Sequence, residues 1–100
     1  MGEWTCFICK NKVVEGQRFT FIPGKGAVHV ECLNKKVLSS PTPDKVAILD
    51  ANEVLLYTIV RLKEAEKSAE SDDIKKVLSS IRKSVEKSAV DLAKIMEKWI

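Results

Sequence analysis

Hydrophobic and polar positions change their period along the chain at a proline-rich stretch. Before it, apolar residues alternate in "QRFTFI" and recur in "AVHV", with the turn sequence "PGKG" between them. This pattern is typical of a β-hairpin. A short helix is expected next, over residues 31–38. The first part of the chain therefore predicts a small lobe in which a hairpin is followed by a helix.

Two prolines interrupt the pattern in "SSPTPDK", residues 39–45. Pro41 and Pro43 each push the preceding residue out of helical geometry and lack the N–H that a helix interior requires. We therefore expect three parts: an N-terminal module over residues 1–40, a linker over residues 41–50, and a helical unit over residues 51–100.

A first long helix is expected over residues 51–70. Asp50 precedes Glu53 by three residues, the spacing of a capping box, and Leu49 and Val54 are placed as in a hydrophobic staple. These four residues therefore predict a helix that begins just after Asp50.

A second long helix is expected after Ser71, a candidate N-cap that two acidic residues follow. Its apolar seam steps by four and three residues throughout: Ile74, Leu78, Ile81, Val85, Ser88, Leu92, Ile95 and Trp99. This heptad spacing predicts an antiparallel hairpin with the preceding helix and an α+β fold for the whole chain. At about 28 residues the second helix would be the longer one, which would leave part of its stripe uncovered. Besides simple core packing, this favours a homodimer through the C-terminal helices.

The hexapeptide "KKVLSS" occurs twice, at residues 35–40 and 75–80. Its neighbours do not align, so it does not indicate a repeat architecture. Since Pro41 follows the first copy and "IRKS" follows the second, we expect a short helix that ends in one case and a long helix in the other.

Composition limits the cellular setting. The 100-residue chain is 45% hydrophobic and 31% charged, and neither a long apolar run nor a signal-like stretch is present in it. We therefore expect no membrane-spanning helix. Three cysteines cannot all pair in disulfides, and a reducing compartment keeps thiols free for other chemistry. The sequence accordingly favours a cytoplasmic protein.

All three cysteines and the single histidine fall into one spacing. Cys6 and Cys9 form a Cys-x₂-Cys pair, and nineteen residues later His29 and Cys32 form a His-x₂-Cys pair. Such pairs, brought together by a hairpin, supply four ligands for a tetrahedral metal site. A redox Cys-x₂-Cys or a hydrogen-bonded core histidine is the alternative, but neither accounts for the shared spacing. We therefore expect one structural Zn²⁺ per chain, which a lobe of about forty residues needs for stability.

Positive charge gathers in the cysteine half, because residues 46–100 are balanced and the net charge of +3 lies in residues 1–45. The candidate nucleic-acid contacts are Lys10, Lys12, Arg18, Lys25, Lys35 and Lys36. Phe19 or Phe21 would offer a stacking face, although both are expected to be hairpin core. The alternative is a solvated face whose lysines offset the charge of the metal-bound thiolates.

The segment that contains the four ligands, with its hydrophobic hairpin and "VHVECL" ending, resembles the first zinc half of a LIM domain and, more broadly, treble-clef and zinc-ribbon modules. It is also similar to a family of small archaeal proteins of unknown function that join such a finger to helices. The resemblance implies metal ligation by Cys6, Cys9, His29 and Cys32. It implies no named partner, because no second Cys-rich module follows Cys32.

These features favour a non-enzymatic module for protein–protein interaction, in which the zinc lobe presents a surface and the helices dimerise or dock. A nucleic-acid-binding zinc-finger protein is the alternative. An enzyme is not expected, because the sequence has no Gly-rich phosphate loop, no second histidine, and no cysteine beyond the ligand set.

Overall fold

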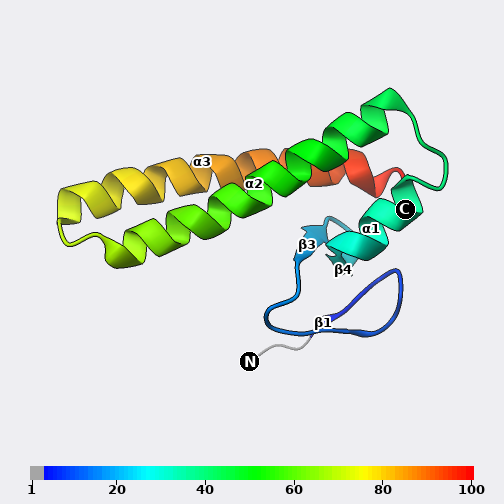
Figure 1. Cartoon of the computed structure of the whole chain (residues 1–100), viewed down its shortest axis with the longest axis horizontal. Coiled ribbons are helices and arrows are strands. Elements are labelled where there is room, and N and C mark those ends of the chain that lie inside the picture. The colour runs from blue at the N-terminus through cyan, green and yellow to red at the C-terminus, as the bar shows by residue number, and fades with distance from the viewer. Residues whose placement is uncertain (1–3) are drawn as a thin grey trace.

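The computed structural model describes residues 4–100 and confirms the α+β fold class (Figure 1). An N-terminal lobe of two small sheets and a short helix precedes a long helical hairpin. The lobe lies against the open end of the hairpin, where its first helix begins and its second helix ends. The closed end of the hairpin projects away from the lobe (Figure 1).

Each sheet of the N-terminal lobe is a two-stranded antiparallel ribbon. Strand β1 (Trp4–Thr5) pairs with β2 (Lys12–Val13), and β3 (Phe19–Ile22) pairs with β4 (Gly26–His29). The turn between β3 and β4 contains Gly24 at φ 77°, a left-handed conformation that glycine adopts without strain. The hairpin predicted around "PGKG" is therefore present.

The two phenylalanines of β3 differ in how far they are buried. Thr20 and Ile22 point into the lobe and are buried, whereas Phe21 is 49% exposed. Since side chains alternate along a strand, Phe19 lies on the same outer face as Phe21. The expectation that both phenylalanines belong to the hairpin core is therefore wrong for Phe21, whereas Phe19 is half-buried and packs against the core.

Helix α1 (Val30–Val37) follows β4 without a loop and lies within one residue of the helix predicted over residues 31–38. Val30, Leu33 and Val37 are buried, and their spacing of three and four residues gives the helix one apolar face. Because α1 begins directly after β4, its first turn fixes the helix to the β3–β4 hairpin.

Helix α2 (Pro43–Ser68) begins eight residues earlier than predicted, so residues 43–50, expected as linker, are helical. Thr42 is the N-cap, and its hydroxyl accepts a hydrogen bond of 3.2 Å from the backbone N–H of Lys45. Pro43 occupies the first turn, where its fixed φ suits a helix and its missing N–H needs no partner. The second proline thus starts a helix and does not break one.

The predicted capping box and hydrophobic staple are absent, because their residues lie inside α2. Glu53 instead accepts a hydrogen bond of 3.1 Å from Asn34 and lies 3.6 Å from Arg18, so it ties α2 to the N-terminal lobe. Leu49 is buried in the core, whereas Val54 is 63% exposed. The sequence has the spacing of a capping box, but Glu53 contacts the N-terminal lobe and does not cap a helix.

Helix α3 (Asp72–Glu97) has Ser71 at its N-cap and two acidic residues in its first turn, as predicted, although Ser71 makes no side-chain cap bond. Both helices of the hairpin contain 26 residues. The prediction of a longer second helix is therefore wrong. No helix in residues 4–100 is long and apolar enough to cross a membrane.

The predicted seam of α3 divides between two faces. Leu78, Val85, Leu92 and Trp99 are partly covered, whereas Ile74, Ile81, Ser88 and Ile95 are exposed. Ala93 and Met96, beside the first set, are buried in the core that α3 shares with the N-terminal lobe. The helix is therefore rotated about its axis relative to a symmetric seam, and this rotation exposes apolar residues.

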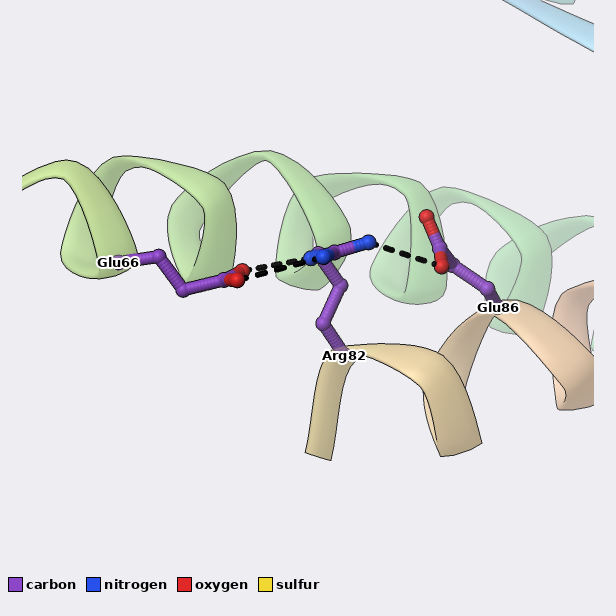
Figure 2. A network of polar contacts seen from close by, with 3 residues as sticks. All are labelled: Glu66, Arg82 and Glu86. Atoms are coloured by element: carbon purple, nitrogen blue, oxygen red, sulfur yellow. Dashed lines mark hydrogen bonds and ion pairs between the residues drawn. The ribbon is translucent and has the colours of Figure 1, made fainter. Parts of the chain in front are cut away.

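A polar network joins the two helices near the closed end of the hairpin (Figure 2). Arg82 on α3 donates two hydrogen bonds to Glu66 on α2 and one of 3.1 Å to Glu86 on its own helix. The side chains of Arg82 and Glu66 are only about 20% exposed. The hydrogen bond from Arg82 lowers the pKa of Glu66 and keeps that carboxylate charged.

One hydrophobic core spans the lobe and the hairpin. Its fully or almost fully buried members include Ile22, Val28, Leu33 and Val37 from the lobe and Leu49, Ala93 and Met96 from the hairpin. Because these side chains form a single cluster, the lobe and the hairpin stabilise each other.

Candidate metal centre

The first two candidate ligands lie on a tight knuckle between β1 and β2. The N–H of Cys6 donates to Asn11 O over 2.8 Å, and the N–H of Lys10 donates to Cys6 O over 2.9 Å. Lys10 has φ 67°, the left-handed conformation that few non-glycine residues adopt. This strained turn places Cys6 and Cys9 on one side of the knuckle.

The other two candidate ligands lie where β4 becomes α1. His29 ends β4 and is the N-cap of α1, and Cys32 belongs to its first turn. The N–H of Val30 donates to Arg18 O over 3.1 Å, which fixes this junction to the start of β3. His29 and Cys32 are three positions apart, so their side chains lie on the same side of the first helical turn.

The four side chains converge as the sequence predicts. One ligand atom from each of Cys6, Cys9, His29 and Cys32 lies within 4.8 Å of all the others. His29 Nδ1 is 3.4 Å from Cys9 Sγ and 3.7 Å from Cys32 Sγ, so this ring nitrogen faces the thiols. These four residues are positioned to bind a metal ion.

The thiols of the cluster differ in their electrostatic surroundings. Burial raises the pKa of Cys6, but backbone hydrogen bonds, among them those from the N–H groups of Cys9 and His29, outweigh burial and lower it to about 6. Burial and the neighbouring sulfurs raise the pKa of Cys32 to about 11. Backbone N–H groups thus favour one thiolate, and a cation is needed to favour the other.

Gln17 supports the centre from outside, and sequence reasoning missed it. Its Oε1 lies 2.9 Å from His29 Nε2 and accepts a second hydrogen bond of 2.9 Å from the N–H of Val14. With Nδ1 facing the thiols, Nε2–H donates to Gln17, the arrangement that orients metal-binding histidines. Gln17 is the chain's single glutamine, but its spacing from the ligands carries no recognisable signal.

The six basic candidates do not gather in one patch, because their contacts divide them among different parts of the lobe. Lys10 and Lys25 come together over the exposed ring of Phe7, at 4.5 and 5.2 Å from its centroid. Arg18 is bound to Glu31 over 3.0 Å. The remaining three lie on β2 or near the end of α1: Lys12, Lys35 and Lys36.

An aromatic cluster covers the outer face of the lobe's strands. Trp4, Phe19 and Phe21 lie with ring centroids 5.2 to 5.6 Å apart in tilted or edge-to-face pairs. Trp4 and Phe21 are more than two-fifths exposed. Aromatic side chains of this kind are enriched at interfaces.

A groove of about 580 Å³, here the lobe groove, separates the N-terminal lobe from α2. Its lining is mostly apolar and comprises Gly16, Gln17, Arg18, Phe19, Glu53, Leu56, Tyr57, Ile59, Val60 and Lys63. Phe19 belongs to both the aromatic cluster and the groove, so the two form one continuous apolar surface. Tyr57 and Val60 extend this surface along α2 and are exposed.

Together the fold and the site define a small α+β protein whose N-terminal lobe carries a Cys₃His cluster positioned to bind a metal ion. The chain belongs to the family described as "Uncharacterized protein conserved in archaea (DUF2175)", whose sequence model matches residues 2–98. The similarity to a family of small archaeal proteins is thereby confirmed. No curated protein and no solved structure matches the chain.

Proposed function

We propose that the chain binds one structural Zn²⁺ in a treble-clef-like lobe and acts as a non-enzymatic module for protein–protein interaction. Its metal-held lobe presents one recognition surface, and its helical hairpin supplies a second contact face. The observation that carries this proposal is the lobe groove, whose wall is built by residues adjacent to the metal centre. A reducing cell interior suits a function that depends on three thiols.

The donor set favours zinc. Three thiolates and one imidazole are a common set for tetrahedral structural Zn²⁺. Zn–S bonds of about 2.3 Å and a Zn–N bond of about 2.0 Å place sulfur and nitrogen roughly 3.5 Å apart at tetrahedral angles. The separations of 3.4 and 3.7 Å between His29 Nδ1 and the sulfurs of Cys9 and Cys32 fit this value. The knuckle, the β3–β4 hairpin and α1 follow one another as in a treble clef.

A structural role suits this centre better than catalysis. Four protein ligands fill a tetrahedral zinc ion and leave no position for water or substrate. In the lobe groove, the charged groups of Arg18 and Glu53 lie 3.6 Å apart as an ion pair. The groove is therefore a surface for apolar contact rather than a polar reaction site.

The partner that fits the lobe groove is a protein segment with apolar side chains. Interfaces gain most of their affinity from a few buried aromatic and apolar anchors within a polar rim. Phe19, Leu56 and Val60 supply the apolar floor. Arg18, Glu53 and Lys63 supply the rim, and the carboxylate of Glu53 makes the groove a poor site for phosphate.

The groove depends on the metal centre through the loop before β3. Gln17 and Arg18 line the groove, while the Gln17 side chain accepts a hydrogen bond from His29 and the Arg18 carbonyl accepts one from the N–H of Val30. Metal binding orders His29, and His29 in turn holds this loop. We therefore expect partner binding to require the metal.

The test combines metal analysis with affinity capture. The purified chain should contain one zinc per chain, and a chain that retains no metal overturns the zinc assignment. Tagged protein is then recovered from its archaeal host as wild type, as V60K in the groove, and as I81K on an exposed face of α3. Partners lost with V60K and with chelator, but retained with I81K, support the proposal. The same set of proteins with all three baits contradicts it.

Nucleic-acid binding is a second candidate, favoured by the two ammonium groups over the exposed Phe7 ring. Cations beside a stackable ring suit single-stranded nucleic acid, and phosphate contacts weaken steeply with salt. Fluorescence anisotropy with a labelled single-stranded RNA at low salt tests it. K10A with K25A should weaken binding and reduce its salt dependence, whereas no binding at low salt rules out this candidate.

A further inference from the structure

Four exposed apolar residues of α3 lie with two serines along one stripe, here the outer stripe, whereas the exposed Val90 lies on another side of the helix. The members of the outer stripe are Ile74, Val77, Ile81, Ser84, Ser88 and Ile95, spaced by three, four or seven residues. Ile74, Val77, Ile81 and Ile95 are 55, 59, 46 and 39% exposed. The stripe carries no charge from Ile74 to Ser88, and Asp91 occupies the next position before Ile95. A run of this length without charge is unusual on a solvated helix face.

The outer stripe lies on the side of the hairpin away from the N-terminal lobe. Two residues along a helix turn by about 200°, so Ile95 points away from Ala93, which is buried in the core shared with the lobe. The same reasoning applies to α2, where Val54 is exposed opposite Leu56 of the lobe groove. The lobe therefore cannot cover the stripe.

We propose that a second copy of this chain covers the outer stripe, with the two α3 helices antiparallel about a two-fold axis near Ser84. This inference rests on the proposed function only in giving the hairpin a binding role. The outer stripe and the lobe groove lie on different faces of the molecule, so an experiment can disprove the role of one surface and leave the role of the other standing.

The area of this face matches that of a stable dimer. A helix of 26 residues is about 39 Å long, and two packed helices are about 20 Å wide. Face-to-face contact therefore buries about 800 Å² per partner, the size of a standard specific interface. The small side chains of Ser84 and Ser88 at the middle of the stripe let the two helices approach closely.

Two pairs of charges beside the stripe are complementary when α3 is reversed, whereas Lys83 and Lys87 on the same side of the helix fall opposite serines. Asp73 and Lys94 stand eleven residues before and ten after Ser84, and Lys76 and Asp91 stand eight before and seven after. An antiparallel pair therefore places Asp73 near Lys94 of the second copy, and Asp91 near Lys76. None of these four forms an ion pair within residues 4–100 of one copy. A parallel pair would place like charges together.

Association is tested by sedimentation equilibrium of the zinc-loaded full chain over a range of concentrations. The wild type should be a dimer, and I81K should weaken association by at least about a hundredfold because a lysine would be desolvated at the centre. V60K, on the opposite side of the hairpin, should remain dimeric. If I81K does not fold, S84R tests the same centre with an exposed residue. A monomeric wild type, or a dimer that I81K and S84R leave intact, overturns the proposal.

The antiparallel orientation is tested by charge reversal. D73K places lysine opposite Lys94, and K94D places aspartate opposite Asp73, so each variant alone should dimerise about two- to tenfold more weakly. When the two variants are mixed, both new pairs are attractive and the heterodimer should predominate in native mass spectrometry. Single variants that dimerise as strongly as the wild type contradict this orientation, because a parallel pair already places like charges opposite each other at residues 73 and 94.

The two surfaces are distinguished by the same variants. I81K should lose self-association but keep any partner of the lobe groove, and V60K should do the reverse. A dimeric wild type whose partners are unaffected by V60K would therefore count against the proposed function alone. A monomeric wild type that loses its partners with V60K would count against this inference alone.

Discussion

Gln17 and His29 are joined by a contact of 2.9 Å between Oε1 and Nε2, while Nδ1 of the same ring faces two thiols. One imidazole thus connects the metal centre to the loop that lines the lobe groove. The glutamine oxygen can only accept, so Nε2 carries the proton and Nδ1 keeps its lone pair for a metal.

Replacement of Gln17 should therefore weaken metal binding without removing a ligand. Q17A is expected to lower zinc affinity by about 10- to 100-fold, because the imidazole loses its orienting acceptor. Competition with a chromophoric chelator measures this affinity. Q17E keeps an acceptor oxygen and is the matched control, and equal affinities for Q17A and wild type would contradict the role of Gln17.

Metal binding should release protons at neutral pH. The pKa of Cys32 is raised to about 11, so this thiol is protonated at pH 7 and must lose its proton to bind zinc. Isothermal titration calorimetry in buffers of different ionisation enthalpy should give at least one proton per metal ion. A value of zero would show that Cys32 is not a ligand or is already ionised.

Loss of the metal should unfold the N-terminal lobe and leave the hairpin helical. The lobe has little core of its own beyond the cluster that it shares with the hairpin, whereas α2 and α3 also pack against each other. Chelation or C32S should remove the dispersed amide signals of β3 and β4 in NMR spectra and retain most of the helical circular dichroism. A C32S variant whose lobe signals persist would disprove the need for metal.

The network around Arg82 should stabilise the hairpin more than an exposed ion pair does. R82M leaves the carboxylate of Glu66 without its hydrogen bonds and should lower the unfolding temperature, whereas R61M breaks only a pair on exposed side chains and should change it little. Equal unfolding temperatures for R82M and R61M would contradict this difference.

The effect of R82M should also depend on pH. Arg82 lowers the pKa of Glu66 in the folded chain, so the unfolded chain binds the proton more readily. The stability from this pair is therefore present above the ordinary carboxyl pKa and disappears as the pH falls through the lower folded value. Thermal melts should show wild type and R82M converging below about pH 4.

The start of α2 offers a test of the cap that the sequence did not reveal. T42A removes the hydroxyl that accepts from Lys45 N–H and should destabilise the chain by about 1 kcal/mol, whereas T42S should be close to wild type. Urea denaturation measures both. If T42A and T42S unfold at the same urea concentration, the cap contributes nothing.

The metal centre was predictable because its signal is local. Two pairs with fixed spacing, Cys6 with Cys9 and His29 with Cys32, need only one hairpin to bring them together, and the "PGKG" turn indicates that hairpin. Gln17 was not predictable, because its contact depends on the conformation of the loop before β3 and no motif encodes it.

The start of α2 was missed because the same residue has opposite effects at different helix positions. Pro43 breaks a helix interior but suits the first turn, and Thr42 before it is a good N-cap. Asp50 and Glu53 have capping-box spacing, yet tertiary contacts with Asn34 and Arg18 decide the role of Glu53. Sequence spacing alone cannot distinguish these cases.

The repeated hexapeptide shows how context sets helix length. In residues 35–40 the helix ends at Val37, before Pro41, whereas residues 75–80 lie inside α3. This outcome was expected from the residues that follow each copy. The rotation of α3 that exposes Ile81 was not, because it arises where the lobe meets Ala93 and Met96.

The core shared by the lobe and the hairpin would carry the effect of a bound metal ion beyond its four ligands. A ligand that binds only the folded state shifts the folding equilibrium of everything that unfolds with its site. Leu49 and Met96 lie in the same cluster as Leu33, next to the ligand Cys32. Unfolding of the lobe on loss of a bound metal ion would therefore leave Leu49 and Met96 uncovered on helices that remain folded, and would expose apolar surface far from the ligands.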